Sequence, residues 1–436
     1  MRVASHVTAV LACVVLGDCT ESATLPGDAL APVTIGVISS ESGSLETLGP
    51  HWTNAFLLAV QEVNAAGGVL PGRRVDVVVT DDETNPAVAG QIAHNLVERQ
   101  GVIGIVGAPG SGASLEVAKV AGPARIPQIS GTSTSPLLNA PDAQGNDMHP
   151  YFFRTVPGDH LQGWVLGSAA RGMFDEGSFT LYCEKVALVH LDDAYGSPFA
   201  DSIAKRVIEL DGSVVAKVPI PEGRPSYQAE VDQLIDSGPD CIAMVLYPDS
   251  GGTIVREWHS SGGDPDVRWL GTDGVRGTGF VEAAGEHAVG VVGTAPASDP
   301  NRPELLAFNS LYEATFAMTP GTMAEAVYDA TALLLLGIAR AGTTNGDDVR
   351  NALFEVSAYE EGEESFGPGE LLRAIEKIRE GVPIDYDGAG GNVDLQPATG
   401  DVIQDYEIWT WDGTAFVRLV NVTVRTILEG MGEGTG

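Results

Sequence analysis

Short β-branched and apolar runs alternate along this chain with longer segments in which apolar residues recur at helical spacing. In the first third of the chain, the apolar runs predict strands at 33–38, 75–79, 101–107 and 126–129. The periodic segments predict helices at 48–66, at 87–99 and from Leu115 onward. Alternation of strands with helices is typical of a parallel sheet with helical crossovers. We therefore expect a Rossmann-like α/β lobe in this part of the chain.

The alternation of predicted strands and helices is interrupted at residues 151–157 and then starts again. Strands are predicted at 186–191, 213–220, 242–247 and 269–270, and helices at 162–172, 198–210 and 227–237. A helix-rich return follows at 303–316, 322–341, 347–356 and 368–378. The chain then forms a β-hairpin of 401–411 and 415–424, and disorder is expected for the tail 427–436. A second α/β lobe is thus expected.

Two polar segments follow strands of the first lobe. Residues 108–114 are small and turn-forming, and residues 130–135 are rich in hydroxyl groups. In an open α/β sheet such segments lie at the carboxyl ends of the strands, where ligands bind. Ser111, Ser133 and Thr134 would there present hydroxyls and free backbone N–H groups to a small anion such as a carboxylate. Neither segment supplies a base, a nucleophile pair or a metal ligand, so the pattern predicts binding without catalysis.

The length, composition and charge of the chain limit its number of domains and its classes of binding partner. The chain of 436 residues is long enough for two domains, and 44% hydrophobic residues suffice for sizeable cores. It carries 24 Lys and Arg against 59 Asp and Glu, a formal net charge of −35. Such a charge disfavours nucleic acid and anionic membrane surfaces as partners. It says little about the ligand, because acidic residues spread over a surface also serve solubility.

The first residues resemble a bacterial lipoprotein signal peptide. Arg2 precedes an apolar segment at 7–17, and the sequence that follows matches a lipobox ending in Cys19, except at Asp18, where a small residue is usual. The expected divisions are a signal peptide at 1–19, with Cys19 as the lipidation site, and a linker at 20–32. No later apolar run reaches the roughly 18 uncharged residues of a membrane span. We expect export to the periplasm, with a lipid anchor as a further expectation.

Two of the four cysteines, Cys183 and Cys241, belong to the folded part, and each falls just before a predicted strand. These two strands are neighbours in the usual doubly wound order, so the cysteines would meet at one edge of the sheet. An oxidising periplasm would pair them. The alternative is two unpaired buried thiols.

Several short motifs follow one another after the leader: Glu62-Val-Asn-Ala-Ala-Gly-Gly68, Asp81-Asp82, His190-Leu-Asp-Asp-Ala-Tyr-Gly196, and Gly391-Asn-Val-Asp-Leu followed by Gly400-Asp-Val. In this order and spacing the chain resembles the type I periplasmic binding proteins, in particular the branched-chain amino-acid-binding group that serves ABC transporters. The resemblance implies two Rossmann-like lobes joined by three hinge crossings. It places lobe one at 33–154 and 296–385, lobe two at 155–295 and 386–426, and the crossings near 154–157, 294–296 and 385–393.

The resemblance also implies a ligand site in the cleft between the lobes. Its residues would be Ser111, Ser133 and Thr134 in lobe one and Tyr195, Tyr247 and Asp273 in lobe two. The chemistry agrees, because a zwitterion needs hydrogen-bond donors at one end and a carboxylate at the other. Leu48 stands where the family has an aromatic residue, and Trp52 one turn later could replace it as a pocket wall. Asp273 replaces a glutamate, which shortens its reach and leaves the ligand side chain open.

Other chemistry is disfavoured. Ala113 occupies the lysine position of a phosphate-binding loop, and the eight histidines lack metal-ligand spacing. Asp81-Asp82 and Asp192-Asp193 sit in strand-to-helix turns, where aspartates cap helices. No catalytic constellation can be assembled, so we expect no enzyme and no cofactor.

The expected function is capture of an amino acid or related small zwitterion by a monomer, which delivers it to the permease of an ABC transporter. The first alternative is a ligand-sensing receptor that acts on a separate membrane partner without transport. The second alternative, a hydrolase, would chemically change its ligand.

Overall fold

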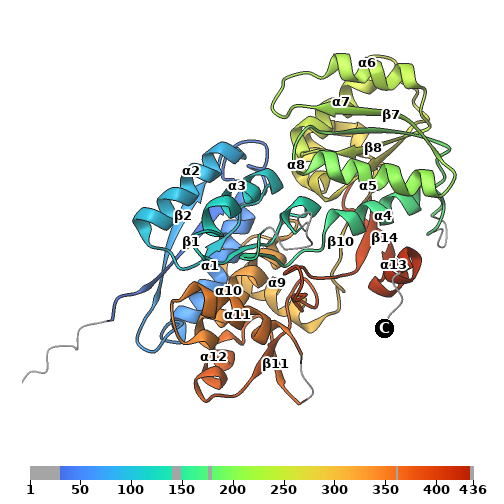
Figure 1. Ribbon diagram of the computed structural model, residues 1–436. Helices are drawn as coiled ribbons and strands as arrows, with labels where there is room; N and C mark the ends of the chain where they lie inside the picture. Colours follow the sequence, from blue (N-terminus) through green and yellow to red (C-terminus); the bar gives the residue numbers. More distant parts are fainter. Residues whose placement is uncertain (1–29, 140–148, 175–178, 360–361, 433–436) are drawn as a thin grey trace, which may run out of the picture.

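The computed structural model describes residues 30–139, 149–174, 179–359 and 362–432. The expected signal peptide, its Cys19 and most of the expected linker lie outside the described residues. The described part forms two α/β lobes side by side, one built from blue, cyan and orange segments and the other mainly from green and yellow ones (Figure 1). Within these residues, no helix is both long and apolar enough to cross a membrane.

Among the described residues, the first lobe has a five-stranded sheet in the order β2-β1-β3-β4-β5, and all its neighbouring pairs are parallel. Its strands are β1 (Val33–Ser39), β2 (Val75–Asp81), β3 (Ile105–Val106), β4 (Gln128–Ser130) and β5 (Phe152–Arg154). The helices between them are α1 (Gly49–Ala65), α2 (Pro86–Asn95) and α3 (Ser111–Ala121). Helices cover the buried β-branched strands, as a parallel sheet requires.

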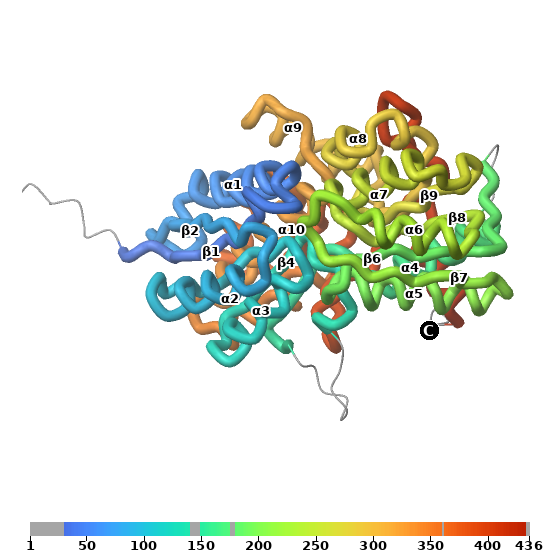
Figure 2. Tube along the Cα trace, turned by 90° about the horizontal axis from the view of Figure 1, so that it is seen from above, coloured from blue at the N-terminus to red at the C-terminus, as the bar shows by residue number. Residues whose placement is uncertain are grey.

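The helix-rich return completes the same lobe. Its elements are α9 (Pro303–Phe316), α10 (Ala324–Ala341), α11 (Gly346–Ser357), β11 (Glu364–Phe366), α12 (Leu371–Arg379) and β12 (Ile384–Tyr386). Most of α10 is buried, and it packs against α1, so that orange and blue segments lie together in Figures 1 and 2. Segments far apart in the sequence therefore share one core.

The second lobe has a seven-stranded sheet in the order β14-β13-β10-β9-β8-β6-β7 among the described residues. Its strands are β6 (Lys185–Leu191), β7 (Ser213–Ile220), β8 (Cys241–Val245), β9 (Arg268–Gly271), β10 (Val292–Pro296), β13 (Tyr406–Trp411) and β14 (Phe416–Val422). Its helices are α4 (Asp159–Ala170), α5 (Gly196–Glu209), α6 (Gln228–Ser237), α7 (Pro248–Ser260) and α8 (Thr278–Ala284). The strands from β6 to β10 pair in parallel, and β13 and β14 add an antiparallel edge.

Two sequence expectations differ from the structure. The predicted strand 101–107 shrinks to β3, because Gly101 adopts a left-handed φ of 62° at the end of the preceding helical turn. Disorder was expected for 427–436, but α13 (Val424–Met431) covers the first part of this tail, and residues 433–436 lie outside the described residues. Thr423 caps this helix and Ile427 is buried, so packing orders a segment whose composition suggested disorder.

The chain passes between the two sheets after β5, after β10 and after β12. At the first crossing, the guanidinium of the buried Arg154 binds both carboxylate oxygens of Asp401, at 2.5 and 3.0 Å. At the third, Asp329 on α10 accepts hydrogen bonds from Tyr386 Oη and from two following backbone N–H groups, all at 2.8 Å. Two lobes joined by three such crossings can close on a ligand by hinge rotation.

The predicted disulfide between Cys183 and Cys241 is present, with Cα atoms 5.7 Å apart. It forms because β6 and β8 are neighbours and Val186 pairs with Cys241. Among the described residues, the two cysteines and Asp240 are also the one convergence of side chains that could ligate a metal. The disulfide removes both thiolates, so this group is a structural cross-link.

Candidate ligand-binding site

A cavity with an empty volume of about 390 Å³ lies between the two lobes. Six residues singled out from the sequence line it: Leu48, Trp52, Ser111, Tyr195, Tyr247 and Asp273. The remaining walls include Pro109, Thr132, Thr322 and Met323. The tertiary structure thus brings together side chains from both lobes and from the distant helical return.

The two tyrosines form one wall of the cavity. Tyr195 follows β6 and Tyr247 follows the neighbouring β8, so both stand at the carboxyl edge of the second sheet. Their rings stack with centroids 5.6 Å apart and planes 6° from parallel. Burial raises the pKa of both hydroxyls well above the ordinary value, so both stay neutral. Asp193 caps α5 by accepting from the backbone N–H of Tyr195 at 2.9 Å, which fixes that turn.

Asp273 follows β9 at the same edge and is 7% exposed. Its carboxylate lies 3.5 Å from the hydroxyl of Tyr195, which also lies 3.0 Å from Thr272 Oγ1. Burial raises the pKa of Asp273 to about 6. No described cation forms an ion pair with it, so a ligand that brings positive charge would stabilise the ionised carboxylate.

A second carboxyl, which sequence reasoning missed, lies close to Asp273. Asp159 is the first residue of α4 and is fully buried. Neither oxygen of its carboxylate has a hydrogen-bond partner of ordinary geometry among the described residues. Burial, and then the nearby Asp273, raise the pKa of Asp159 well above its ordinary value. The sequence carried one signal, an acidic residue directly after Gly158 in the connection between β5 and α4.

The hydroxyl residues of lobe one divide between the cavity and the interior. Ser111 opens α3, lines the cavity and accepts a hydrogen bond from the Ser135 backbone at 3.2 Å. The Ser133 hydroxyl lies 2.9 Å from the Ala108 carbonyl and 2.8 Å from Ser114 Oγ, inside the lobe. Thr132 lines the cavity in its place, and its hydroxyl donates to the Pro109 carbonyl at 3.0 Å.

Thr134 lies at the border of the site rather than in the cavity wall. It is 1% exposed, and its carbonyl accepts the backbone N–H of Asp159 at 2.8 Å. It therefore connects the loop after β4 to the start of α4, next to the buried carboxyl. Of the three hydroxyl residues expected to hold a ligand, Ser111 alone lines the cavity.

Leu48 and Trp52 close the cavity from the first lobe. Leu48 stands at the start of α1 and Trp52 lies one turn later. The indole N–H of Trp52 donates to the Thr322 carbonyl at 2.9 Å, which ties α1 to the segment before α10. Leu48 and Trp52 both line the cavity, and their role as walls of a ligand site stays a prediction.

The lobes touch directly at the edge of the cavity. The hydroxyl of Ser135 in lobe one donates to the Ala194 carbonyl in lobe two at 2.6 Å. A side chain at Gly110 would begin 3.3 Å from the hydroxyl of Tyr247, so the glycine permits this close approach. The lobes are therefore in contact beside the cavity, which stays partly open to solvent.

Comparison with known proteins agrees with this architecture. A family model described as periplasmic binding protein matches residues 32–415. The chemotactic signal transduction system substrate-binding protein BasB of Halobacterium salinarum is 28% identical over 396 residues, 86% of each chain. The leucine-binding protein LivK of Thermotoga maritima has a TM-score of 0.75 at 19% identity, covering 90% of this chain and 99% of that one.

A third similar protein binds a different class of compound. It is a solute-binding protein of an ABC transporter from Rhodopseudomonas palustris, solved with 3,4-dihydroxybenzoic acid. Its TM-score is 0.70 at 20% identity, and the match covers 90% of this chain and 98% of that one. Since the family model spans most of the residues, the chain belongs to the type I periplasmic binding proteins, a family of solute-binding proteins rather than enzymes.

Proposed function

We propose that this protein captures an amino acid or related small zwitterion in the cavity between its lobes and delivers it to an ABC transporter. One observation carries the proposal: the carboxylate of Asp273, which has no ion-pair partner among the described residues, and the hydroxyl of Ser111 at the start of α3 line the same cavity from opposite lobes. A ligand ammonium would pair with the first. A ligand carboxylate would accept hydrogen bonds from the Ser111 hydroxyl and from the free backbone N–H groups at the start of α3.

The lining of the cavity supports a small ligand with an apolar part. The stacked Tyr195 and Tyr247, together with Leu48 and Trp52, provide apolar surface for the rest of the ligand.

Closure would couple binding to recognition by the transporter. Because the site is complete only when both lobes contribute, the ligand prefers the closed state and shifts the equilibrium toward it. The ABC transporter permease is the expected partner. The leader at 1–19 and Cys19 support a location outside the cytoplasm, with a lipid anchor as part of the proposal.

Calorimetry tests the ligand class. Protein stripped of endogenous ligand is titrated with a panel of free amino acids and, separately, with benzoate and 3,4-dihydroxybenzoate, which have a carboxylate but no amine. We expect at least one amino acid to bind, and Asp273→Asn to weaken that binding more than it weakens any binding of the aromatic acids. Binding of the aromatic acids alone would contradict the amino-acid assignment.

A sensory role is the second candidate, because the relative with the chemotaxis name matches 86% of both chains. The same cavity and the same closure would then signal to a membrane receptor. A strain lacking the gene separates the roles. Loss of uptake of the labelled ligand supports transport, whereas loss of movement toward the ligand with intact uptake supports sensing.

A further inference from the structure

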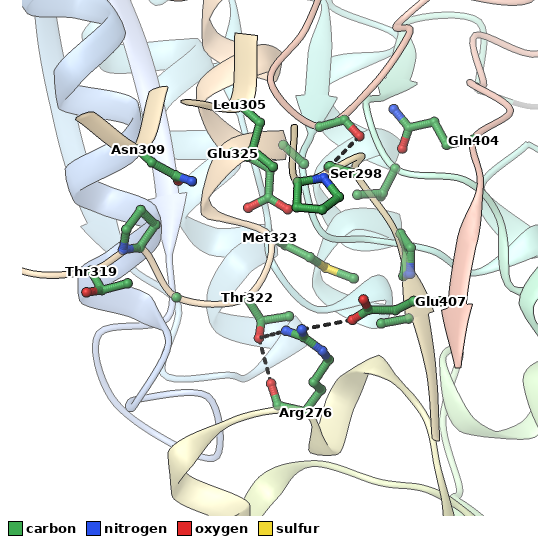
Figure 3. A pocket seen from close by; sticks show the side chains of 18 of the residues that line it. Arg276, Ser298, Leu305, Asn309, Thr319, Thr322, Met323, Glu325, Gln404 and Glu407 are labelled. Carbon is green, nitrogen blue, oxygen red and sulfur yellow. Dashed lines mark hydrogen bonds and ion pairs between the residues drawn. The ribbon is translucent and has the colours of Figure 1, made fainter. Parts of the chain in front are cut away.

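A second and larger cavity lies directly behind the ligand site, with an empty volume of about 1000 Å³, part of it open to solvent (Figure 3). It is bounded by β10 of the second lobe, by α9 and by the start of α10. Thr322 and Met323 line both cavities. These two residues therefore form the wall between the proposed amino-acid site and this space.

The two wall residues differ in how they are held. Thr322 is fixed, because its carbonyl accepts from Trp52 of lobe one and its hydroxyl donates to the Arg276 carbonyl of lobe two at 2.6 Å. The side chain of Met323 makes no hydrogen bond, and an unbranched thioether chain changes rotamer easily. The backbone of Met323 has a left-handed φ of 62°, which is unusual for a residue with a side chain. Such outliers gather at functional sites.

An unpaired carboxylate lies on the far side of this wall. Glu325 is in the first turn of α10, and its side chain lines the second cavity close to Met323 (Figure 3). No described cation forms an ion pair with it. Glu407 in the same cavity, by contrast, pairs with Arg276 at 2.8 Å and with Arg418 at 2.7 Å. Burial raises the pKa of Glu325, and this effect outweighs the lowering of the pKa by a hydrogen bond from its own backbone N–H and by the charge of Arg276.

We propose that the two cavities form one binding volume, in which the second holds the positively charged distal end of an extended amino-acid ligand and Glu325 pairs with it. The inference rests on the proposed function, since the α-amino and carboxyl groups would occupy the first cavity. Met323 acts as the movable partition, because it lines both cavities. Ligands that fit the first cavity alone would leave the Met323 side chain in its present position.

The charges favour a cation over an anion at this position. Glu407 already engages both arginines of the cavity, and Arg418 also donates to the Ser298 carbonyl at 2.8 Å. Arg276 keeps its buried Nε without a hydrogen-bond partner among the described residues, but the cavity lining carries three carboxylates, Glu313, Glu325 and Glu407, against these two arginines, so its net charge is negative. A primary ammonium or guanidinium group at the end of an alkyl chain is the matching chemistry.

The test compares lysine with norleucine, which has the same alkyl chain but lacks the terminal ammonium. For the wild type we expect lysine to bind about 10- to 100-fold more tightly, the effect of a charge-assisted hydrogen bond. Glu325→Gln should abolish this preference and leave norleucine affinity unchanged. Glu313→Gln is the matched control, because Glu313 lines the same cavity but is exposed to solvent, and it should keep the preference. Equal affinities in the wild type, or an unchanged preference in Glu325→Gln, would overturn the inference.

A second variant tests the partition. Met323→Ala should raise the affinity for lysine and for norleucine relative to alanine, which is short enough for the first cavity. An unchanged ratio would refute the role of Met323.

Alanine or another small amino acid also separates the two proposals. Binding of small amino acids without any preference for lysine defeats only this inference. Failure of every amino acid to bind defeats the proposed function. Circular dichroism of each variant confirms that it is folded.

Discussion

The rings of Tyr195 and Tyr247 stack face to face, 5.6 Å between centroids, although 52 positions separate them along the chain (247 − 195 = 52). The pairing follows from topology, because β6 and β8 are hydrogen-bonded neighbours and each tyrosine begins the helix after its strand. The stack is a rigid surface at the carboxyl edge of the second sheet, directly beside Asp273. It positions one half of the proposed site before any ligand arrives.

The first prediction concerns this surface. Tyr195→Ala removes the ring that packs on Tyr247 and the hydroxyl near Asp273, so we expect ligand affinity to fall by about 10- to 100-fold, as for loss of an aromatic contact of roughly 1.5–3 kcal/mol. Tyr195→Phe keeps the ring and should lose much less. Calorimetric titration measures both variants. Equal losses in the two would show that the hydroxyl, rather than the stacked surface, carries the contribution.

Asp273 carries a prediction about pH. Folding raises its pKa from 3.8 to about 6, so the unliganded protein loses stability from this group as pH rises from about 4 to 6. A bound ammonium favours the ionised carboxylate and lowers that pKa again. Affinity for an amino acid should therefore rise about tenfold between pH 5 and pH 7.

The control for this pH effect is Asp273→Asn, which has no carboxyl to titrate at this position. Its weaker affinity should be nearly independent of pH over the same interval. Titrations in two buffers with different ionisation enthalpies should also show proton release on binding near pH 6 in the wild type. A pH profile that is equally steep in Asp273→Asn would assign the titration to another group.

The disulfide yields a prediction that separates stability from binding. Cys183 and Cys241 are 58 residues apart, and closing such a loop stabilises a folded chain by roughly 4 kcal/mol through the entropy of the unfolded state. The double variant Cys183→Ala and Cys241→Ala should lose stability of that order in urea denaturation. Ligand affinity should stay unchanged, because the cysteines stand at the opposite end of β6 and β8 from the tyrosines. A parallel loss of affinity would contradict this separation.

The net charge of −35 predicts strong dependence on salt. Like charges repel one another in the compact state, and screening shortens the range of this repulsion from about 10 Å at 0.1 M salt to about 3 Å at 1 M. The unfolding temperature should therefore rise with sodium chloride and level off near 1 M. Potassium chloride should give the same curve. A large difference between the two salts would point to specific cation binding instead of screening.

Local patterns were sufficient for much of the fold. Apolar runs and helical periodicity predict the alternating elements, and the rule that ligands bind at the carboxyl ends of parallel strands brings Ser111, Tyr195, Tyr247 and Asp273 to one cavity. The same reasoning predicts the disulfide, because it needs only the order of neighbouring strands. Short strands and the tail were less predictable. The shortness of β3 and the helix α13 depend on a left-handed glycine and on contacts made by Ile427.

By itself, the sequence determined the two α/β lobes, the resemblance to a binding-protein family and the strand ends from which the site is built, since these depend on residue type and spacing along the chain. The tertiary structure alone decided which side chains line the cavity: Thr132 in its wall and Ser133 in the interior, Asp159 buried beside Asp273, and Met323 in the wall of two cavities. The physical reason is that these placements depend on contacts between separate segments, 25 residues apart for Ser133 with Ala108 and 270 for Trp52 with Thr322. No local pattern encodes such contacts.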